Sequence, residues 1–196
     1  MKAKLDQQYW TNRYHNHETA WDAGRITTPL KDYFDSLKNK EARILIPGSG
    51  NAYEAEYLIN GGFKNVFVCD LALPPLEALK QRCPSLRSEQ LIHGNFFELK
   101  NVQFDYVIEQ TFFCAIDPSF RPSYFEKMLE ILSPGGILAG VLFNDTLNTD
   151  FPPFGGNKEE YLEYIPSAFE ILHFEACRNS IAPRAGRELF MQLKKR

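Results

Sequence analysis

A short apolar run that leads directly into a glycine turn constrains the fold of this chain more than any other sequence feature. The run Ile44-Leu45-Ile46 is followed at once by Pro47-Gly48-Ser49-Gly50. A run of this length is typical of a strand that is buried on both faces of a parallel sheet. The two glycines allow the backbone to turn sharply and to approach a ligand closely. The pattern predicts a binding turn at the carboxyl end of a parallel strand, where α/β sheets hold their ligands.

Strand-like and helix-like segments alternate along the chain. Strands are predicted near residues 43–46, 65–70, 90–92, 104–108, 137–143, 169–177 and 187–193. Helical spacing or helix-start residues occur near 9–14, 29–37, 52–61, 75–79, 122–132 and 158–165. Such alternation implies right-handed crossovers and a parallel sheet. The last two strands have no helix between them, so they are predicted to form a hairpin that adds an antiparallel strand.

These elements predict an α/β fold: a Rossmann-like, doubly wound and mostly parallel seven-stranded sheet with an antiparallel last strand, plus an N-terminal helical cover. The chain has 196 residues, and about 100–200 residues make one domain. We therefore expect a single domain over 1–196, with the cover in 1–40 and the Rossmann-like core in 41–196.

Composition excludes several classes of partner. The net charge is −3 and basic residues do not cluster except at the C-terminal tail, so no nucleic-acid partner is expected. No apolar run reaches the roughly 18 residues of a membrane span, and the N-terminus lacks the apolar core of a signal peptide. The four cysteines are widely spread and the histidines lack metal-ligand spacing. We expect a cytoplasmic monomer with reduced thiols, no bound metal and a small molecule as its partner.

A carboxylate at the end of the second predicted strand points to a cofactor that carries a nucleoside. Asp70 lies about 20 residues after the glycine turn, where it can accept hydrogen bonds from two ribose hydroxyls. A dinucleotide fingerprint would have a third glycine at the place of Tyr53. S-adenosylmethionine fits better, because it needs no phosphate cradle. Asn95 and Phe96 follow the third strand, where an amide could bond the adenine amine and a ring could stack on the base.

Three motifs give the chain a resemblance to a known family from about Tyr9 to the C-terminus. They are Trp10-x3-Tyr14-x6-Trp21-Asp22-x-Gly24-Arg25, then Phe112-Phe113-Cys114-Ala115-Ile116-Asp117-Pro118 with Arg121-Pro122, and Ile181-Ala182-Pro183-Arg184-x-Gly186-Arg187. With these motifs the chain resembles the thiopurine, thiol and halide methyltransferase family of S-adenosylmethionine enzymes.

The resemblance implies roles for individual residues. The positions that match the family's cofactor contacts are Trp10, Tyr14, Trp21, Gly48, Gly50, Asp70, Asn95, Phe96 and Glu109. Candidates for the acceptor pocket are Arg25, Gln110, Phe112, Phe113, Arg121 and Arg184. An Asp-Tyr pair that is common in the family is Glu109-Gln110 here. Purely structural roles stay open: core packing for the phenylalanines and tryptophans, and ion pairing for the arginines.

The predicted function is transfer of a methyl group from S-adenosylmethionine to a small sulfur nucleophile or halide, such as a thiol, thiocyanate, a thiopurine or an iodide-like acceptor. An anionic nucleophile needs orientation and exclusion of water rather than a base, so no catalytic residue is assigned. A loop over residues 151–154 is expected to cover the substrate, with Gly155-Gly156 as its hinge. Two alternatives stay open: a nicotinamide-dependent oxidoreductase, and a non-catalytic nucleoside-binding protein.

Overall fold

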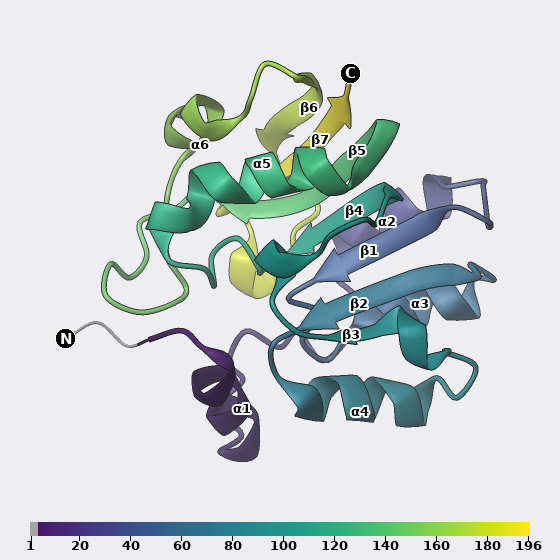
Figure 1. Cartoon of the computed structure of the whole chain (residues 1–196). Helices are drawn as coiled ribbons and strands as arrows, with labels where there is room; N and C mark the ends of the chain where they lie inside the picture. Colours follow the sequence, from purple (N-terminus) through teal and green to yellow (C-terminus); the bar gives the residue numbers. More distant parts are fainter. Residues whose placement is uncertain (1–3) are drawn as a thin grey trace.

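A seven-stranded sheet organises the molecule, in the order β3-β2-β1-β4-β5-β7-β6 (Figure 1). The computed structural model describes residues 4–196, so residues 1–3 of the expected cover lie outside the described residues. The strands are β1 (Arg43–Pro47), β2 (Asn65–Asp70), β3 (Leu91–His93), β4 (Phe104–Gln110), β5 (Leu132–Phe143), β6 (Phe169–Ala176) and β7 (Glu188–Lys195). Strands β1 to β5 pair in parallel, and β7 runs antiparallel to both β5 and β6. The predicted fold class and the C-terminal hairpin are confirmed.

The strand order reverses beside β1, and this reversal positions the site. Strand β1 pairs with β2 on one side, where Pro47 lies opposite Cys69. On its other side it pairs with β4, where Leu45 lies opposite Val107. The connections that leave β1 and β4 therefore diverge to opposite faces of the sheet. This divergence opens a crevice at the carboxyl edge, where ligands of open α/β sheets bind.

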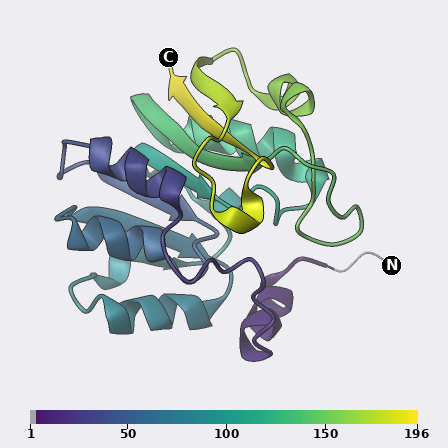
Figure 2. The same cartoon turned by 180° about the vertical axis from the view of Figure 1, so that it is seen from behind.

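Helices cover both faces of the sheet. Helices α2 (Thr28–Ser36), α3 (Tyr53–Asn60) and α4 (Leu73–Arg82) contribute to one apolar cluster, and α5 (Arg121–Ile131) and α6 (Lys158–Tyr164) contribute to the other. In Figure 1, α5 crosses in front of the sheet and α2 and α3 lie behind it; Figure 2 brings them forward. The predicted apolar stripes are buried as helical spacing requires, with Leu76 and Leu79 on α4 and Phe125 and Met128 on α5.

The N-terminal helix stands apart from these two layers. Helix α1 (Gln7–His15) lies beyond the carboxyl ends of β1 and β2 (Figure 1). Asp6 caps the helix by accepting a hydrogen bond of 3.0 Å from the backbone N–H of Tyr9. No residue of α1 is buried. The helix is therefore held by ring contacts at its surface rather than by insertion into the apolar core.

Four short 3₁₀ turns complete the strand ends: η1 (Ser88–Gln90), η2 (Phe96–Glu98), η3 (Pro118–Phe120) and η4 (Ala182–Arg184). Strand β5 is longer than predicted, because it begins at Leu132 and not at residue 137. Gly135 and Gly136 lie within the strand. The pairing of β5 with β4 shifts register between Phe104 and Tyr106 to accommodate them. Within residues 4–196, no helix combines the length and apolar character needed to cross a bilayer.

Candidate active site

A pocket of about 1110 Å³ opens at the carboxyl edge of the sheet, where the strand order reverses. Its wall combines the turn after β1, the ends of β2 and β4, the turn after β3, and the segment that includes α1. The loop after β5 and the turn η4 close the remaining side. The segments that carry the predicted motifs therefore meet around one cavity, although they lie far apart in sequence.

The glycine turn forms the floor of this pocket. Gly48 and Gly50 have positive φ values of 55° and 52°, which favour glycine. A Cβ atom on Gly48 would overlap the ring of Phe112. A Cβ atom on Gly50 would lie 3.2 Å from the hydroxyl of Tyr14 and 3.8 Å from Nε1 of Trp21. Backbone conformation thus favours glycine at both positions, and at Gly48 the contact with Phe112 also leaves no room for a side chain.

Asp70 ends β2 directly beside the turn. Its carboxylate accepts hydrogen bonds from the N–H groups of Gly50, at 3.0 Å, and Ala72, at 2.8 Å. Burial raises the pKa of Asp70 above its usual range, although these two N–H groups oppose the rise. The residue lines the pocket as predicted, and it also holds the glycine turn against the second strand.

Three aromatic side chains close the pocket above the turn. The ring of Trp21 lies edge-to-face with Trp10, at a centroid distance of 5.7 Å, and with Tyr14, at 5.8 Å. All three residues line the pocket. Tyr14 is partly buried, and the loss of contact with water raises the pKa of its hydroxyl. The predicted aromatic cover is thus a connected cluster of rings.

Polar contacts dock this cover onto the sheet. The carboxylate of Asp22 accepts hydrogen bonds from the side chains of Asn51, in the β1–α3 connection, and Tyr53, the first residue of α3. Nη2 of Arg184 donates to the backbone carbonyl of Trp21 at 2.7 Å. The cover is therefore attached to the glycine turn on one side and to η4 on the other.

The predicted adenine pair also lines the pocket. Asn95 caps η2, since its Oδ1 accepts a hydrogen bond of 3.0 Å from the N–H of Phe97, and its Nδ2 donates to Glu98. The ring of Phe96 is 2% exposed and lies edge-to-face with Phe112 at 5.2 Å. Phe96 thus contributes both to the apolar core and to the pocket wall.

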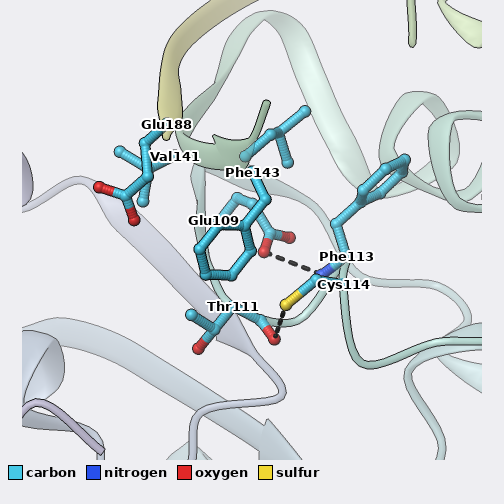
Figure 3. A pocket seen from close by; sticks show the side chains of 8 residues that line it. Glu109, Thr111, Phe113, Cys114, Val141, Phe143 and Glu188 are labelled. Atoms are coloured by element: carbon cyan, nitrogen blue, oxygen red, sulfur yellow. Dashed lines mark hydrogen bonds between the residues drawn. The ribbon is translucent and has the colours of Figure 1, made fainter. Parts of the chain in front are cut away.

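Glu109 lies outside the large pocket, which differs from its expected role as a cofactor contact. The side chain is fully buried, and Oε1 accepts hydrogen bonds from the N–H groups of Phe112 and Phe113, at 2.8 Å and 2.9 Å. Oε2 accepts from the hydroxyl of Tyr124 at 2.6 Å. Figure 3 shows the carboxylate directed at the backbone of the loop. Burial raises its pKa to about 7. Glu109 therefore positions the aromatic loop from behind.

Phe113, expected in the acceptor pocket, lies in the apolar core instead. Its ring packs against Tyr124, Phe125 and Tyr161, and the side chain is 1% exposed. Phe112, its neighbour, lines the pocket instead. Because Glu109 fixes both N–H groups in one tight turn, the two rings point to different environments. Phe113 belongs to the core and Phe112 to the pocket.

Arg121 is also structural rather than part of the pocket wall. It is 2% exposed, forms an ion pair of 2.6 Å with Glu160, and donates to the carbonyl of Gly155 at 2.7 Å. These contacts fasten the loop after β5. Gly155 and Gly156, the predicted hinge, are closely packed: a Cβ on either residue would overlap neighbouring atoms, and Gly156 exchanges two backbone hydrogen bonds of 3.0 Å with Asp145. The loop itself contributes Pro152 and Pro153 to the pocket wall.

Three acceptor candidates besides Phe112 do line the pocket: Arg25, Gln110 and Arg184. Arg25 is exposed. Oε1 of Gln110 accepts a hydrogen bond of 2.8 Å from the hydroxyl of Thr27. Within residues 4–196, Nε2 of Gln110 and Nη1 of Arg184 are buried without a hydrogen-bond partner, although Nη1 of Arg184 forms an ion pair of 3.6 Å with Oε1 of Glu188. Buried donors without partners are costly unless a ligand satisfies them.

The wall suits S-adenosylmethionine. Oγ of Ser49, between the two glycines, is also buried without a hydrogen-bond partner among the described residues. A nucleoside with an aminoacyl arm offers hydroxyl, amino and carboxylate groups that can satisfy such atoms. The carboxylate of Asp70 and the rings of the cover offer partners for ribose and for a positively charged sulfur.

Some wall residues were not identified from the sequence. Glu54 is buried and lines the pocket from the first turn of α3, and Thr27 and Ser49 join the same wall. An acidic residue in the first turn of a helix is ordinarily a surface residue that interacts with the helix dipole. The position of Glu54 directly after the glycine turn was the only available signal.

Comparison with known proteins identifies relatives along nearly the whole chain. The family described as Thiopurine S-methyltransferase (TPMT) matches residues 5–192. Probable thiol methyltransferase 2 of Arabidopsis thaliana is 26% identical over 191 residues, which cover 95% of this chain and 84% of that protein. Thiocyanate methyltransferase 1 of Brassica oleracea is 27% identical over 196 residues, which cover 97% of this chain and 86% of that protein.

A solved structure shares the fold. It is the 1,6-didemethyltoxoflavin-N1-methyltransferase of Burkholderia thailandensis, crystallised with 1,6-didemethyltoxoflavin and S-adenosylhomocysteine. The TM-score is 0.76 at 18% identity, and the match covers 96% of this chain and 86% of that chain. The family match and this shared fold show that the chain belongs to the thiopurine S-methyltransferase family and is an enzyme with S-adenosylmethionine as its methyl donor.

Proposed function

We propose that this enzyme methylates a small sulfur nucleophile or a halide: a thiol, thiocyanate, a thiopurine or an iodide-like acceptor. Relatives named as a thiol methyltransferase and as a thiocyanate methyltransferase support this class of acceptor. Neither the oxidoreductase nor the non-catalytic alternative agrees with the family to which the chain belongs.

On the donor side, the proposal assigns ribose to Asp70 and adenine to Asn95 and Phe96. The residues that would enclose the rest of the cofactor are Trp10, Tyr14, Trp21, Gly48 and Gly50. When bound, S-adenosylmethionine supplies a methyl group on a positively charged sulfur. An aromatic face near that charge contributes roughly 0.5–2 kcal/mol of attraction. The rings of the cover also exclude water from the cation.

On the acceptor side, one observation carries the proposal: buried N–H donors that make no hydrogen bond lie in the same wall as an aromatic ring. Nε2 of Gln110 and Nη1 of Arg184 supply the donors, and Phe112 supplies the ring. A soft anion is suited to such a site, since donors balance its charge and the ring gives an apolar surface. Arg25 at the exposed end adds positive charge that favours the approach of anions.

Such an acceptor needs little acid–base chemistry. A thiolate, thiocyanate or halide is already a nucleophile, so orientation and exclusion of water supply most of the acceleration. Among residues 4–196, no group of three or more His, Cys, Asp or Glu side chains could hold a metal ion. The proposal accordingly assigns the residues of this wall to binding and orientation.

A panel of acceptors tests the proposal. The enzyme is incubated with methyl-labelled S-adenosylmethionine and, in separate reactions, thiocyanate, iodide, alkyl thiols and thiopurines. We expect methyl transfer to at least one of these acceptors and tight binding of the donor by calorimetry. Donor binding without turnover of any acceptor would contradict the acceptor class. Arg184→Gln should raise KM for anionic acceptors, whereas Arg178→Gln, outside the pocket wall, should leave KM unchanged.

The proposal includes the setting in which the enzyme works. We propose a cytoplasmic monomer that forms one domain, with residues 1–40 as its cover and 41–196 as its core. All four cysteines are unpaired and buried, which suits a reducing compartment. Light scattering coupled to size-exclusion chromatography tests the oligomeric state, and a mass of twice 22.6 kDa would contradict it.

A further inference from the structure

Glu54 is a buried carboxylate in the wall of the active-site pocket without an assigned role. It occupies the first turn of α3, immediately after the glycine turn, and is 6% exposed. Among residues 4–196, no cationic side chain lies within 4.0 Å of it as an ion-pair partner. The N–H groups of Thr27 and of Glu54 itself are its hydrogen-bond donors. A buried carboxylate with such limited compensation is unusual for a purely structural residue.

Asp70, the other buried carboxylate in the described part of the wall, already has hydrogen-bond partners. Among the described residues, Asp70 and Glu54 are the two buried acidic side chains that line this pocket. Asp70 accepts hydrogen bonds from Gly50 and Ala72 and holds the glycine turn at the ribose side. Asp22 lies in the same wall, but Asn51 and Tyr53 donate to its carboxylate.

Glu54 shares the pocket wall with Gln110 and Arg184, the proposed acceptor residues. Thr27 donates its backbone N–H toward Glu54 and its hydroxyl to Oε1 of Gln110, so it connects the two side chains. Arg184 from η4 and Asp22 from the cover are the charged groups that act on Glu54 through space. Nε2 of Gln110 and Nη1 of Arg184 are the buried donors that make no hydrogen bond, and Nη1 of Arg184 forms an ion pair with Glu188.

The environment of Glu54 allows it to exchange a proton near neutral pH. Burial raises its pKa to about 7, and Asp22 adds to the rise, while the two backbone N–H groups and Arg184 oppose it. A general base works best when its pKa lies near the operating pH. At neutral pH this carboxylate is therefore partly ionised and able to accept a proton.

We propose that Glu54 accepts the proton of a neutral thiol acceptor, which lets the enzyme methylate thiols as well as acceptors that are already anions. The inference rests on the proposed acceptor class. In this step the S–H proton goes to an oxygen of Glu54, and an electron pair of the acceptor sulfur forms the new S–CH₃ bond. The pair of the broken methyl–sulfur bond stays on the donor's sulfur, which becomes neutral. Glu54 then releases its proton to water.

Two acceptors that differ in their proton separate this role from a structural one. Wild type and Glu54→Gln are compared with 2-mercaptoethanol, which is protonated at neutral pH, and with thiocyanate, which is always an anion. We expect Glu54→Gln to lower kcat/KM for the thiol about 100-fold at pH 7. For thiocyanate we expect kcat/KM to stay within about twofold. The thiol activity of the variant should recover as pH rises toward the pKa of the thiol.

The matched control is Glu56→Gln. This residue lies on the same helix, outside the pocket wall, and forms an ion pair of 2.7 Å with Arg82. It should leave the ratio of the two activities unchanged. An equal loss of both activities in Glu54→Gln would show a structural role and overturn the proposal. Wild type that methylates thiocyanate but not 2-mercaptoethanol overturns it too, yet leaves the proposed acceptor class intact.

Two measurements do not depend on the activity of a variant. The wild-type pH profile for the thiol should rise through a pKa near 7 that is missing from the thiocyanate profile, and identical profiles contradict the proposal. Urea unfolding at several pH values measures the ionisation of Glu54 without any enzyme assay. Glu54→Gln should reduce the dependence of the unfolding free energy on pH, and an unchanged dependence excludes Glu54 as a group that titrates near neutrality.

Discussion

Gly48 combines two constraints at one residue. Its φ is positive, and a Cβ atom would overlap the ring of Phe112. The glycine therefore lets the first strand turn while the aromatic loop after β4 rests directly on the turn. Backbone freedom is needed at several glycines, but here it also sets the distance between two walls of the pocket.

The first prediction concerns this residue. Gly48→Ala should weaken S-adenosylmethionine binding at least tenfold and lower the unfolding free energy by about 1–3 kcal/mol, because the methyl group displaces Phe112. Calorimetric titration and urea unfolding measure the two effects. Gly62→Ala is the control, since Gly62 has a φ of 87° but no atom within 4 Å of its Cβ position. It should lower stability by about 1 kcal/mol and leave binding unchanged.

At the scale of elements, the aromatic cover is an attachment rather than a part of the core. Helix α1 buries no residue, and Trp21 joins it to the rest through its ring contacts and its carbonyl. An element with few buried contacts opens with a free energy well below that of global unfolding. Binding of the cofactor is therefore expected to stabilise α1 more than the sheet.

A second prediction follows for this element. Trp21→Ala should weaken cofactor binding about tenfold or more, because Trp10 and Tyr14 lose their shared ring contact. The midpoint of global unfolding should change little. Hydrogen exchange of residues 7–15 should become faster, while exchange in β1 and β4 stays the same. Equal acceleration in the strands would show that the cover is part of the folding core. Tyr164→Ala, on α6, serves as the control because it lies outside the pocket wall.

The same elements show what the sequence could predict. Strands and helices were predictable because their apolar periods are long and turns bound them. The directions of neighbouring side chains in a tight turn were not predictable, so the sequence could not show that Phe112 lines the pocket and Phe113 lies in the core. Arg121 could not be assigned either, because its partner Glu160 lies 39 positions away. Motif position grouped residues that line one pocket, but burial of Glu54 and Glu109 depends on how the elements pack.

For the whole molecule, buried carboxyl groups link folding to pH. Burial raises the pKa values of Glu54 and Glu109 from 4.5 to about 7. The folded state therefore binds more protons than the unfolded state between these values, so the unfolding free energy falls as pH rises from about 4.5 to 7. The contribution is fully present below the lower value and is lost above the upper one.

The third prediction uses this linkage. Glu109→Gln removes the buried charge yet keeps an oxygen for the N–H groups of Phe112 and Phe113. It should therefore reduce the fall in unfolding free energy between pH 5 and 8 by about 1–3 kcal/mol. Urea unfolding at several pH values measures it. Glu130→Gln is the control, because this side chain is 52% exposed and pairs with Lys127. If Glu109→Gln leaves the dependence of the unfolding free energy on pH unchanged, as Glu130→Gln should, Glu109 does not have the raised pKa.

The hydrogen bond from Arg184 to the carbonyl of Trp21 has a consequence for how the protein is made. It joins two segments that lie 163 positions apart in the sequence, so the second is translated well after the first. The aromatic cover is translated early but has no anchor on this side until η4 has been translated. Nascent chains can therefore build most of the sheet before the pocket is complete. Tight retention of the methyl donor should begin only after residue 184 has left the exit tunnel.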